Sequence, residues 1–206
     1  MTKPNILLIG AGGHAKSCID VIEQEGSYSV GGLVGLPEQV GSSIFGYPVL
    51  GTDEDLPRLL ESYPCALVAL GQIKTWQKRK RSFNNLVYIG YKLPTIISPF
   101  AYVSKHASIG AGTIVFHGAT VNAGSTVGNN CIINSNALVE HESTIGDHCH
   151  LSTGSIVNGV VQIGACSFIG SNACIREGIL VGERCVVGMA QVVTKDCADG
   201  STFPII

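Results

Sequence analysis

Residues 97–115 read ISPFAYVSKHASIGAGTIV, and from Ile97 onward an aliphatic residue stands at every sixth position. The pattern continues without a break as far as Val193. Its seventeen members are Ile97, Val103, Ile109, Val115, Val121, Val127, Ile133, Val139, Ile145, Leu151, Val157, Ile163, Ile169, Ile175, Val181, Val187 and Val193. A period of six residues fits neither an α-helix nor a plain β-strand, so it predicts a solenoid of short strands joined by tight turns.

Small side chains mark further positions of this repeat. The fourth residue after the aliphatic one is usually small, and Gly often follows the aliphatic residue directly, as at Gly110 and Gly146. Gly makes up 26 of the 206 residues, about twice its average share, as a chain of many turns requires. Cys131, Cys149 and Cys185 fall in the small-residue position, and we expect them to be buried, reduced thiols.

The overall composition limits the classes to which the chain can belong. A formal charge of −2 and a charged fraction of 14% provide no general attraction for nucleic acid or an anionic membrane. The chain lacks the apolar stretch of ~18 residues that suggests a membrane helix, and it lacks a basic-then-apolar signal segment. The eight cysteines form no C-x-x-C pair, and we expect a cytoplasmic protein. A low charge with 45% hydrophobic residues suggests that other subunits cover some apolar surface.

The N-terminal part has a different pattern, in which short apolar strands alternate with helical segments. We expect strands at residues 5–9, 28–35, 65–70 and 86–89, and helices at 15–22, 56–60 and 75–86. Such alternation predicts a small parallel sheet with helices on its faces. Pro94 and Pro99 flank the change of period, so we divide the chain into an α/β domain at residues 1–94 and a β-helix domain at residues 95–206.

A glycine-rich loop follows the first predicted strand. Gly10, Gly12 and Ala15 satisfy the G-x-G-x-x-G/A pattern of nucleotide-binding loops between a strand and a helix. Gly lets the backbone approach a ligand, and the N–H groups at a helix start attract phosphate. The acidic residue that this pattern requires about 20 positions later is missing, because Glu38 is the first acid after the second predicted strand. The loop could bind a redox dinucleotide, bind another phosphate-bearing ligand or be purely structural, and His14 could face either a bound anion or solvent.

The hexad that begins at Val139 contains two residues that a turn does not require. His141 and Glu142 occupy turn positions that elsewhere hold Asn, Gly, Lys or Ala. An imidazole beside a carboxylate that can fix its tautomer has the composition of a general base. His148 and His150 follow in the next hexad, and either could contact a ligand. The three histidines could also form a metal site, but their spacing matches no common ligand motif, so we expect no metal. An ordinary surface histidine at position 141 is the other alternative.

A basic run formed by Lys74, Lys78, Arg79, Lys80 and Arg81 lies on one of the predicted helices. It could bind phosphate groups or RNA, but the chain lacks the wider basic surface that such binding needs. We therefore interpret the run as a solvated helix face.

The hexads and the His141–Glu142 pair together resemble the left-handed parallel β-helix acyltransferases, whose repeat has the form [Ile/Leu/Val]-Gly-x-x-small-x. Among these, the layout is similar to the bacterial sugar acetyltransferases of the sialic-acid O-acetyltransferase and bacillosamine-pathway N-acetyltransferase type. The segments that carry this resemblance are Gly10–Lys16, Ala69–Gly71, Ile97–Pro99, Asn134–Glu142 and Ile145–Ser152. The resemblance covers nearly all of residues 5–194.

The resemblance implies a small Rossmann-like α/β domain with a parallel sheet, followed by a left-handed parallel β-helix of hexapeptide repeats. Three hexads would form one triangular coil, so the aliphatic positions correspond to between five and six coils. The resemblance also implies a homotrimer with active sites between neighbouring subunits. The ligands would be a nucleotide sugar and acetyl-CoA, with no metal, nucleic-acid or membrane partner.

The resemblance further implies roles for individual residues. His141 would take a proton from the acceptor, Glu142 would raise its basicity, and the acceptor would attack the thioester of acetyl-CoA directly. The backbone N–H of Gly159 would stabilise the oxyanion. The remaining implied contacts are those of His150, Ser171 and Met189 with acetyl-CoA, those of Gly12, Gly13, His14 and Gly71 with the nucleotide sugar, and that of Asn134 with the acceptor.

The function that we expect is acetyl-CoA-dependent N-acetylation of a nucleotide-linked amino-dideoxy sugar, such as a UDP-4-amino sugar, for polysaccharide or glycan synthesis. The enzymatic alternative is O-acetylation of a sialic acid or a related sugar, which would use the same base. A third alternative is a non-catalytic β-helix scaffold or sugar sensor, which the His141–Glu142 pair disfavours.

Overall fold

The computed structural model describes residues 3–73 and 75–203, and the chain divides into two compact units. The first unit comprises Met1–Gly71 and Gln77–Ile96, and the second comprises Gln72–Trp76 and Ile97–Ile206. The short segment 72–76 thus groups with the second unit, although it lies within the first in sequence. Lys74 of the basic run lies outside the described residues.

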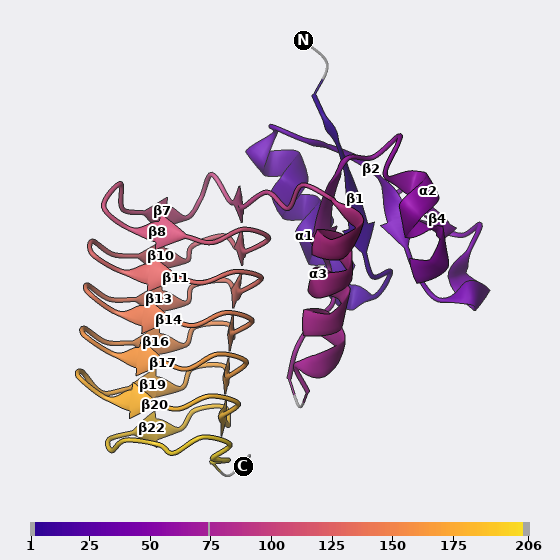
Figure 1. The fold of residues 1–206 in the computed structure, drawn as a ribbon. Coiled ribbons are helices and arrows are strands. Elements are labelled where there is room, and N and C mark those ends of the chain that lie inside the picture. The colour runs from indigo at the N-terminus through magenta and orange to yellow at the C-terminus, as the bar shows by residue number, and fades with distance from the viewer. Residues whose placement is uncertain (1–2, 74, 204–206) are drawn as a thin grey trace. The chain divides into compact units, whose positions relative to one another are not determined.

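The first unit contains a five-stranded sheet with the strand order β3-β4-β2-β1-β5 (Figure 1). Its strands are β1 (Asn5–Ile9), β2 (Ser29–Val34), β3 (Ser43–Ile44), β4 (Tyr47–Gly51) and β5 (Cys65–Val68). Its helices are α1 (Gly13–Glu25), α2 (Leu56–Leu59) and α3 (Gln77–Ile89), with short 3-10 turns η1 (Pro37–Gln39) and η2 (Asp53–Asp55). All pairings are parallel except that of β3 with β4. β1 and β5 read as continuous apolar runs because both of their faces are buried.

Two features of this unit differ from the sequence-based expectation. The strand predicted at residues 86–89 is wrong, because these residues continue α3. Arg79, Phe83 and Leu86 are buried at intervals of four and three residues, which is the spacing of one side of a helix. The β3–β4 hairpin was not predicted, because residues 43–51 contain no long apolar run.

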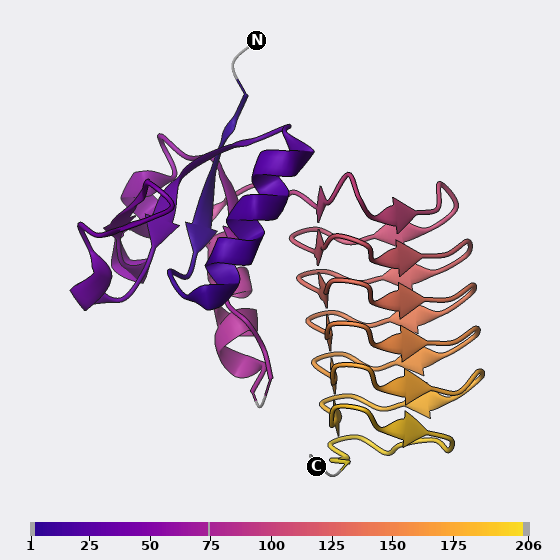
Figure 2. The same cartoon turned by 180° about the vertical axis from the view of Figure 1, so that it is seen from behind.

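The second unit is a parallel β-helix in which every strand has two residues (Figures 1 and 2). Face I contains β6 (Ile96–Ile97), β9 (Ile114–Val115), β12 (Ile132–Ile133), β15 (His150–Leu151), β18 (Phe168–Ile169) and β21 (Val186–Val187). Face II contains β7 (Tyr102–Val103), β10 (Thr120–Val121), β13 (Leu138–Val139), β16 (Ile156–Val157), β19 (Cys174–Ile175) and β22 (Val192–Val193). Face III contains β8 (Ser108–Ile109), β11 (Thr126–Val127), β14 (Thr144–Ile145), β17 (Gln162–Ile163) and β20 (Leu180–Val181).

The aliphatic ladder forms the interior of the β-helix. The members of the ladder from Val115 to Val193 are buried in one hydrophobic cluster, and Ile97, Val103 and Ile109 pack against it partly buried. Full burial of one such side chain contributes about 1.5–3 kcal/mol. The ladder therefore supplies the hydrophobic core that holds the coils together.

A column of hydroxyl and thiol groups runs along the corner between faces III and I. Thr113 Oγ1 donates to the carbonyl of Gly128 at 2.8 Å, and Cys149 Sγ donates to the carbonyl of Gly164 at 3.2 Å. Cys131, Cys149 and Cys185 are buried thiols outside any disulfide, as the sequence predicts. Burial raises the pKa of the Cys149 thiol, so it stays protonated and acts as a hydrogen-bond donor.

The outward residues give the three faces different surfaces. Those of face III are all exposed, and all but the last are polar: Ser108, Thr126, Thr144, Gln162 and Leu180. Those of face II are mostly apolar and half-buried or exposed, and are Tyr102, Thr120, Leu138, Ile156, Cys174 and Val192. Those of face I are buried except the half-buried Val186, and include His150 and Phe168. None of the helices in residues 3–73 and 75–203 is long and apolar enough to cross a membrane.

Candidate functional site

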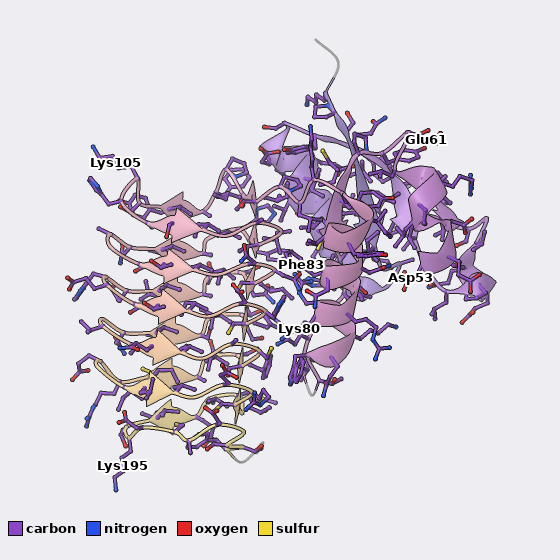
Figure 3. All side chains as sticks on the ribbon, in the orientation of Figure 1. Asp53, Glu61, Lys80, Phe83, Lys105 and Lys195 are labelled. Carbon is purple, nitrogen blue, oxygen red and sulfur yellow. The ribbon has the colours of Figure 1, made fainter. Side chains whose placement is uncertain are left out.

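The corner between faces II and III carries the exposed polar groups of the central coils. Figure 3 shows Lys105 and Lys195 projecting from the two ends of this corner. His141 occupies the same turn position two coils after Lys105, directly after the strand β13 and the half-buried Glu140. The exposed fraction of the His141 side chain is 60%, so its ring is accessible to a ligand.

His141 and Glu142 form a loose pair. Nδ1 of His141 lies 3.4 Å from Oε2 of Glu142, and the exposed fraction of the Glu142 side chain is 71%. Glu142 has a φ of 57°, in the left-handed region that Gly124 and Gly178 occupy at the equivalent turn position. A side chain in that conformation costs on the order of 1 kcal/mol. The carboxylate therefore stands beside the imidazole at some cost to the stability of the turn.

Gly159 lies beneath the ring of His141 in the next coil. A Cβ atom at Gly159 would lie 2.6 Å from Cε1 and 2.7 Å from Nε2 of His141, so a side chain at this position would displace the ring. Among the hydrogen bonds of the described residues, none is donated by the N–H of Gly159. This corner thus brings together an imidazole, a carboxylate and a backbone donor.

His150 and Asn134 form a second polar group on and beside face I. Nδ2 of Asn134 lies 3.3 Å from Nε2 of His150, and Nδ1 of His150 lies 2.5 Å from the carbonyl oxygen of Gln72. His150 is buried, and its ring packs edge-on against Phe168 with a centroid distance of 5.2 Å. His148 is also buried, and its Nδ1 lies 2.9 Å from Nδ2 of Asn130, so His148 is part of the turn structure.

Asn134, Ser171 and Met189 lie at the corner between faces I and II, in three different coils. Oγ of Ser171 lies 2.9 Å from Oγ of Ser152, and Met189 exposes 53% of its surface. The structure thus places the predicted acetyl-CoA contacts Ser171 and Met189 along one corner, with His150 on the adjoining face I. It places His141 at the corner on the opposite border of face II. One chain does not bring all the predicted residues of the β-helix together.

The first unit contains a cavity of about 240 Å³ at the carboxyl ends of its parallel strands. Its lining residues are Ile9, Gly10, Ala11, Gly12, Val34, Gly35, Leu36, Gln39, Asp53, Leu70, Lys78 and Ser82. Ligands of open parallel sheets bind at this edge, because the loops after neighbouring strands meet there. All of these residues belong to the first unit, and Lys78 and Ser82 among them come from α3.

The glycine-rich loop forms one wall of this cavity. Gly10 has a φ of 121°, and a Cβ atom there would lie 2.7 Å from Cδ2 of Leu70, so this position requires Gly. A Cβ atom at Gly12 or Gly13 would meet no atom within 4 Å, so space is open beside them. Gly12 caps α1 without a side-chain hydrogen bond, and the first turn of α1 contains no acid. The helix start therefore suits an anion.

His14 and Gly71 lie close to each other beside this loop. His14 is the second residue of α1, and a Cβ atom at Gly71 would lie 3.8 Å from Cβ of His14. Gly12 lines the cavity, whereas Gly13, His14 and Gly71 are not among its lining residues. Their predicted contact with the sugar part of a ligand stays a prediction.

Two side chains around the cavity, those of Asp53 and Gln39, were not predicted from the sequence, whereas Lys78 belongs to the basic run. Asp53, labelled in Figure 3, is an acid that lines the cavity, and it follows β4, the strand that the sequence did not predict. Gln39 joins the two loops, because its Nε2 donates to the carbonyl of Ala11 at 3.1 Å and its Oε1 accepts from the N–H of Leu36 at 2.9 Å. Lys78 brings a positive charge to the cavity from α3.

The interpretation of the basic run as a solvated helix face is wrong for Arg79. This side chain is buried, and its Nη1 donates to the carbonyls of Val68 and Leu70 at 2.6 and 2.8 Å. Arg79 thus fixes α3 to the end of β5. Burial raises the pKa of the nearby Cys18 thiol to about 12, although the charge of Arg79 opposes this rise. No group of three His, Cys, Asp or Glu side chains within residues 3–73 and 75–203 could hold a metal ion.

Known families match the α/β part and the β-helix part of the chain separately. Residues 5–86 match the PglD N-terminal domain. Residues 124–159 match the bacterial transferase hexapeptide (six repeats), and residues 160–195 match the hexapeptide repeat of succinyl-transferase. These matches and the three stacked sheets identify the second unit as a left-handed β-helix of hexapeptide repeats, as predicted. No protein with a curated description matches the chain.

Several solved structures are similar over almost the whole chain. The acetyltransferase domain of PglB from Neisseria gonorrhoeae is 34% identical, with a TM-score of 0.88 over 97% of this chain and 96% of that one. PerB from Caulobacter crescentus, in complex with CoA and GDP-perosamine, is 31% identical, with a TM-score of 0.90 over 98% of this chain and 94% of that one. WeeI from Acinetobacter baumannii is 23% identical, with a TM-score of 0.83 over 98% and 96%, and shares the fold.

Proposed function

The chain belongs to the bacterial sugar acetyltransferases that join a PglD-type N-terminal domain to hexapeptide repeats, and on this premise we propose that it N-acetylates a nucleotide-linked amino-dideoxy sugar with acetyl-CoA. Two similar structures support this choice of ligands. The acetyltransferase domain of PglB has been solved in complex with acetyl-CoA, and PerB with CoA and GDP-perosamine. The reaction transfers the acetyl group from sulfur to nitrogen.

The observation that carries the proposal is the His141 ring above Gly159, with Glu142 beside it. Nε2 of His141 removes a proton from the acceptor amine as the amine nitrogen attacks the thioester carbonyl carbon. The C–N bond forms, the C–S bond breaks, and the departing CoA thiolate takes up a proton. Glu142 near Nδ1 stabilises the imidazolium that forms, and the N–H of Gly159 stabilises the oxyanion.

We propose that the cavity of the first unit binds the nucleotide diphosphate. Gly12, Gly13 and the start of α1 provide backbone donors for the phosphates, and Lys78 adds a positive charge. Asp53 provides an acceptor for hydroxyl or N–H groups of the nucleoside. His14 and Gly71 lie beyond the loop, on the path of the sugar. A phosphate-bearing ligand of this kind agrees with the cavity better than a redox dinucleotide does, because the cavity is small.

We further propose that the transfer site is completed by a second chain in a homotrimer. A rotation axis turns the same face of every copy inward, so the corner on one border of face II meets the opposite corner of the next copy. The half-exposed apolar residues of face II, such as Leu138 and Ile156, fit such a buried face. His141 of one chain would then approach Asn134, Ser171 and Met189 of its neighbour, where acetyl-CoA binds. The eight cysteines, all within the described residues, are thiols outside any disulfide, which agrees with a reducing compartment, so we place the enzyme in the cytoplasm.

An assay of CoA thiol release tests the reaction. The purified chain is given acetyl-CoA with UDP-, dTDP- and GDP-linked amino sugars, and separately with sialic acid. We expect release with at least one nucleotide-linked amino sugar. Release with sialic acid alone would favour the O-acetyltransferase, and no release with any acceptor would favour a non-catalytic scaffold.

Mixed oligomers test the shared site. Chains with His141→Ala and chains with Asn134→Ala are co-expressed, since each variant damages a different corner. If the two corners come from neighbouring chains, random mixing leaves about a quarter of the sites intact. We expect the mixture to show about a quarter of the wild-type rate, well above either variant alone. A mixture no more active than its two parents would show that both corners belong to one chain or that the site lies elsewhere.

A further inference from the structure

Gln72 is held on the β-helix by two hydrogen bonds that run in opposite directions. Nε2 of Gln72 donates to the carbonyl of His148 at 2.9 Å, and the carbonyl of Gln72 accepts from Nδ1 of His150 at 2.5 Å. Gln72 is 2% exposed and belongs to the same compact unit as these histidines. The first bond fixes the segment that carries the second.

The second bond fixes the tautomer of His150. A backbone carbonyl can only accept a hydrogen bond, so Nδ1 of His150 must carry the proton. In the neutral imidazole, Nε2 then carries a lone pair and can only accept. The edge-on contact with Phe168, with an interplanar angle of 68°, also holds the plane of the ring.

The orientation of Asn134 agrees with this tautomer. The N–H of Ser135 donates to Oδ1 of Asn134 at 2.8 Å, which turns the amide nitrogen toward Nε2 of His150 at 3.3 Å. The hydrogen bonds thus run in one direction, from Asn134 to His150 and from His150 to Gln72. Asn134 is half-buried, and its amide group has a second N–H that this chain of bonds does not use.

We propose that Gln72 is a positioning residue for acetyl transfer, which holds His150 as the Nδ1–H tautomer and thereby aims the amide of Asn134 at the ligand. His150 then accepts an N–H group, from Asn134 or from the ligand, and does not donate to the thioester carbonyl. The donor at this corner is the second N–H of Asn134. The catalytic consequence rests on the proposed function, whereas the tautomer does not.

The structure offers matched variants for a test. Gln72→Met keeps a side chain of similar volume and removes the donor to His148. It also removes Oε1, which is buried without a hydrogen bond among the described residues, so the packing should tolerate the change. Ile73→Ala changes the neighbouring residue, which exposes 61% of its surface, and serves as the control.

The experiment combines NMR of histidine-labelled full-length protein with kinetics. His150→Gln identifies the His150 signals by removing them. In the wild type we expect a protonated Nδ1 and an unprotonated Nε2. In Gln72→Met we expect signals averaged between the two tautomers and a kcat lower on the order of tenfold or more, with both unchanged in Ile73→Ala.

Two results would overturn the proposal. One is a wild-type His150 that is protonated on Nε2, and the other is a Gln72→Met protein with wild-type signals and wild-type kcat. The wild-type spectrum decides the tautomer even if a variant fails to fold. If the wild type transfers no acetyl group to any acceptor, the proposed function fails, and the spectra still show whether Gln72 sets the tautomer.

Discussion

The two units of this chain build their sites in opposite ways. The cavity of the first unit gathers residues from the ends of β1, β2, β4 and β5, and one chain completes it. The β-helix distributes its candidate residues over two corners and one face, so that His141 and Met189 lie at different borders of face II. In an open parallel sheet, the loops after neighbouring strands meet at one edge, so their side chains lie close together. In a solenoid, equivalent residues of successive coils line up in separate columns. For this reason we propose that a neighbouring chain completes the site of the β-helix, whereas the cavity of the α/β unit is lined by one chain.

His141→Ala is expected to have the largest effect on turnover, and it should affect the site of the β-helix but not the cavity of the first unit. Loss of a general base lowers kcat about 10²–10⁴-fold, while the cavity and the acetyl-CoA corner stay intact. CoA release and calorimetric binding of nucleotide sugar and acetyl-CoA measure the two properties separately. His106→Ala, an exposed histidine of the same corner, is the control. Near wild-type turnover of His141→Ala would remove His141 from the mechanism.

The next effect distinguishes face II from face III. Ile156→Glu places a charge on the apolar face, and burying a charge without a partner costs several kcal/mol. We expect this variant to lose the oligomer and its activity, while Thr144→Glu on polar face III keeps both. Light scattering after gel filtration measures the mass. A trimer that persists with Ile156→Glu would exclude face II as the interface.

A smaller effect concerns the cavity alone. Gly12→Ala adds a methyl group in open space, and the φ of −108° at Gly12 suits Ala, so the fold should be kept. The methyl group would occupy the approach of a phosphate, and such overpacking costs about 1–3 kcal/mol. We expect a nucleotide-sugar Kd raised on the order of tenfold, with acetyl-CoA binding and Tm unchanged. An unchanged Kd would place the phosphates elsewhere.

The smallest effect concerns the scaffold of the β-helix. Oγ of Ser143 donates to the carbonyl of Asn158 at 2.8 Å, whereas Oγ of Ser155 is buried without a hydrogen bond among the described residues. Loss of the bonded hydroxyl should cost about 1–2 kcal/mol, and loss of the other should be neutral or slightly stabilising. Urea unfolding of Ser143→Ala and Ser155→Ala compares them. Equal destabilisation would mean that Ser155 has a partner in solution.

The sequence predicted the β-helix far better than it predicted the cavity. Each hexad repeats the same pattern of aliphatic and small residues, so every step of the ladder from Ile97 to Val193 indicates the same fold. The cavity depends on β4, which has only a few residues and follows a turn rather than a long apolar run. Without β4, Asp53 has no strand end to follow, and sequence periodicity cannot reveal it.

Long-range contacts explain the remaining misses. Arg79 is buried and donates to two carbonyls at the end of β5, and Gln72 is buried and forms hydrogen bonds with two histidines that lie 76 and 78 residues later in the chain. Arg and Gln are residue types that do not indicate burial. The groups that bond to Arg79 and Gln72 also lie outside the local sequence pattern of these residues. The His141–Glu142 pair is conspicuous in the sequence, because the repeat shows which side chains a turn does not need, and its catalytic role stays a prediction.

The stacking of coils also sets the spacing between the two residues of the proposed chemistry, His141 and Gly159. Val139 pairs with Val157 across neighbouring strands, so His141 and Gly159 occupy equivalent positions in successive coils. The distance between them is therefore the strand spacing of about 4.8 Å, which backbone hydrogen bonds impose on every β-sheet. A substitution elsewhere in the chain cannot stretch this interval without breaking the ladder. The backbone thus fixes the spacing between the residue that carries the proposed base and the residue that carries the proposed oxyanion donor.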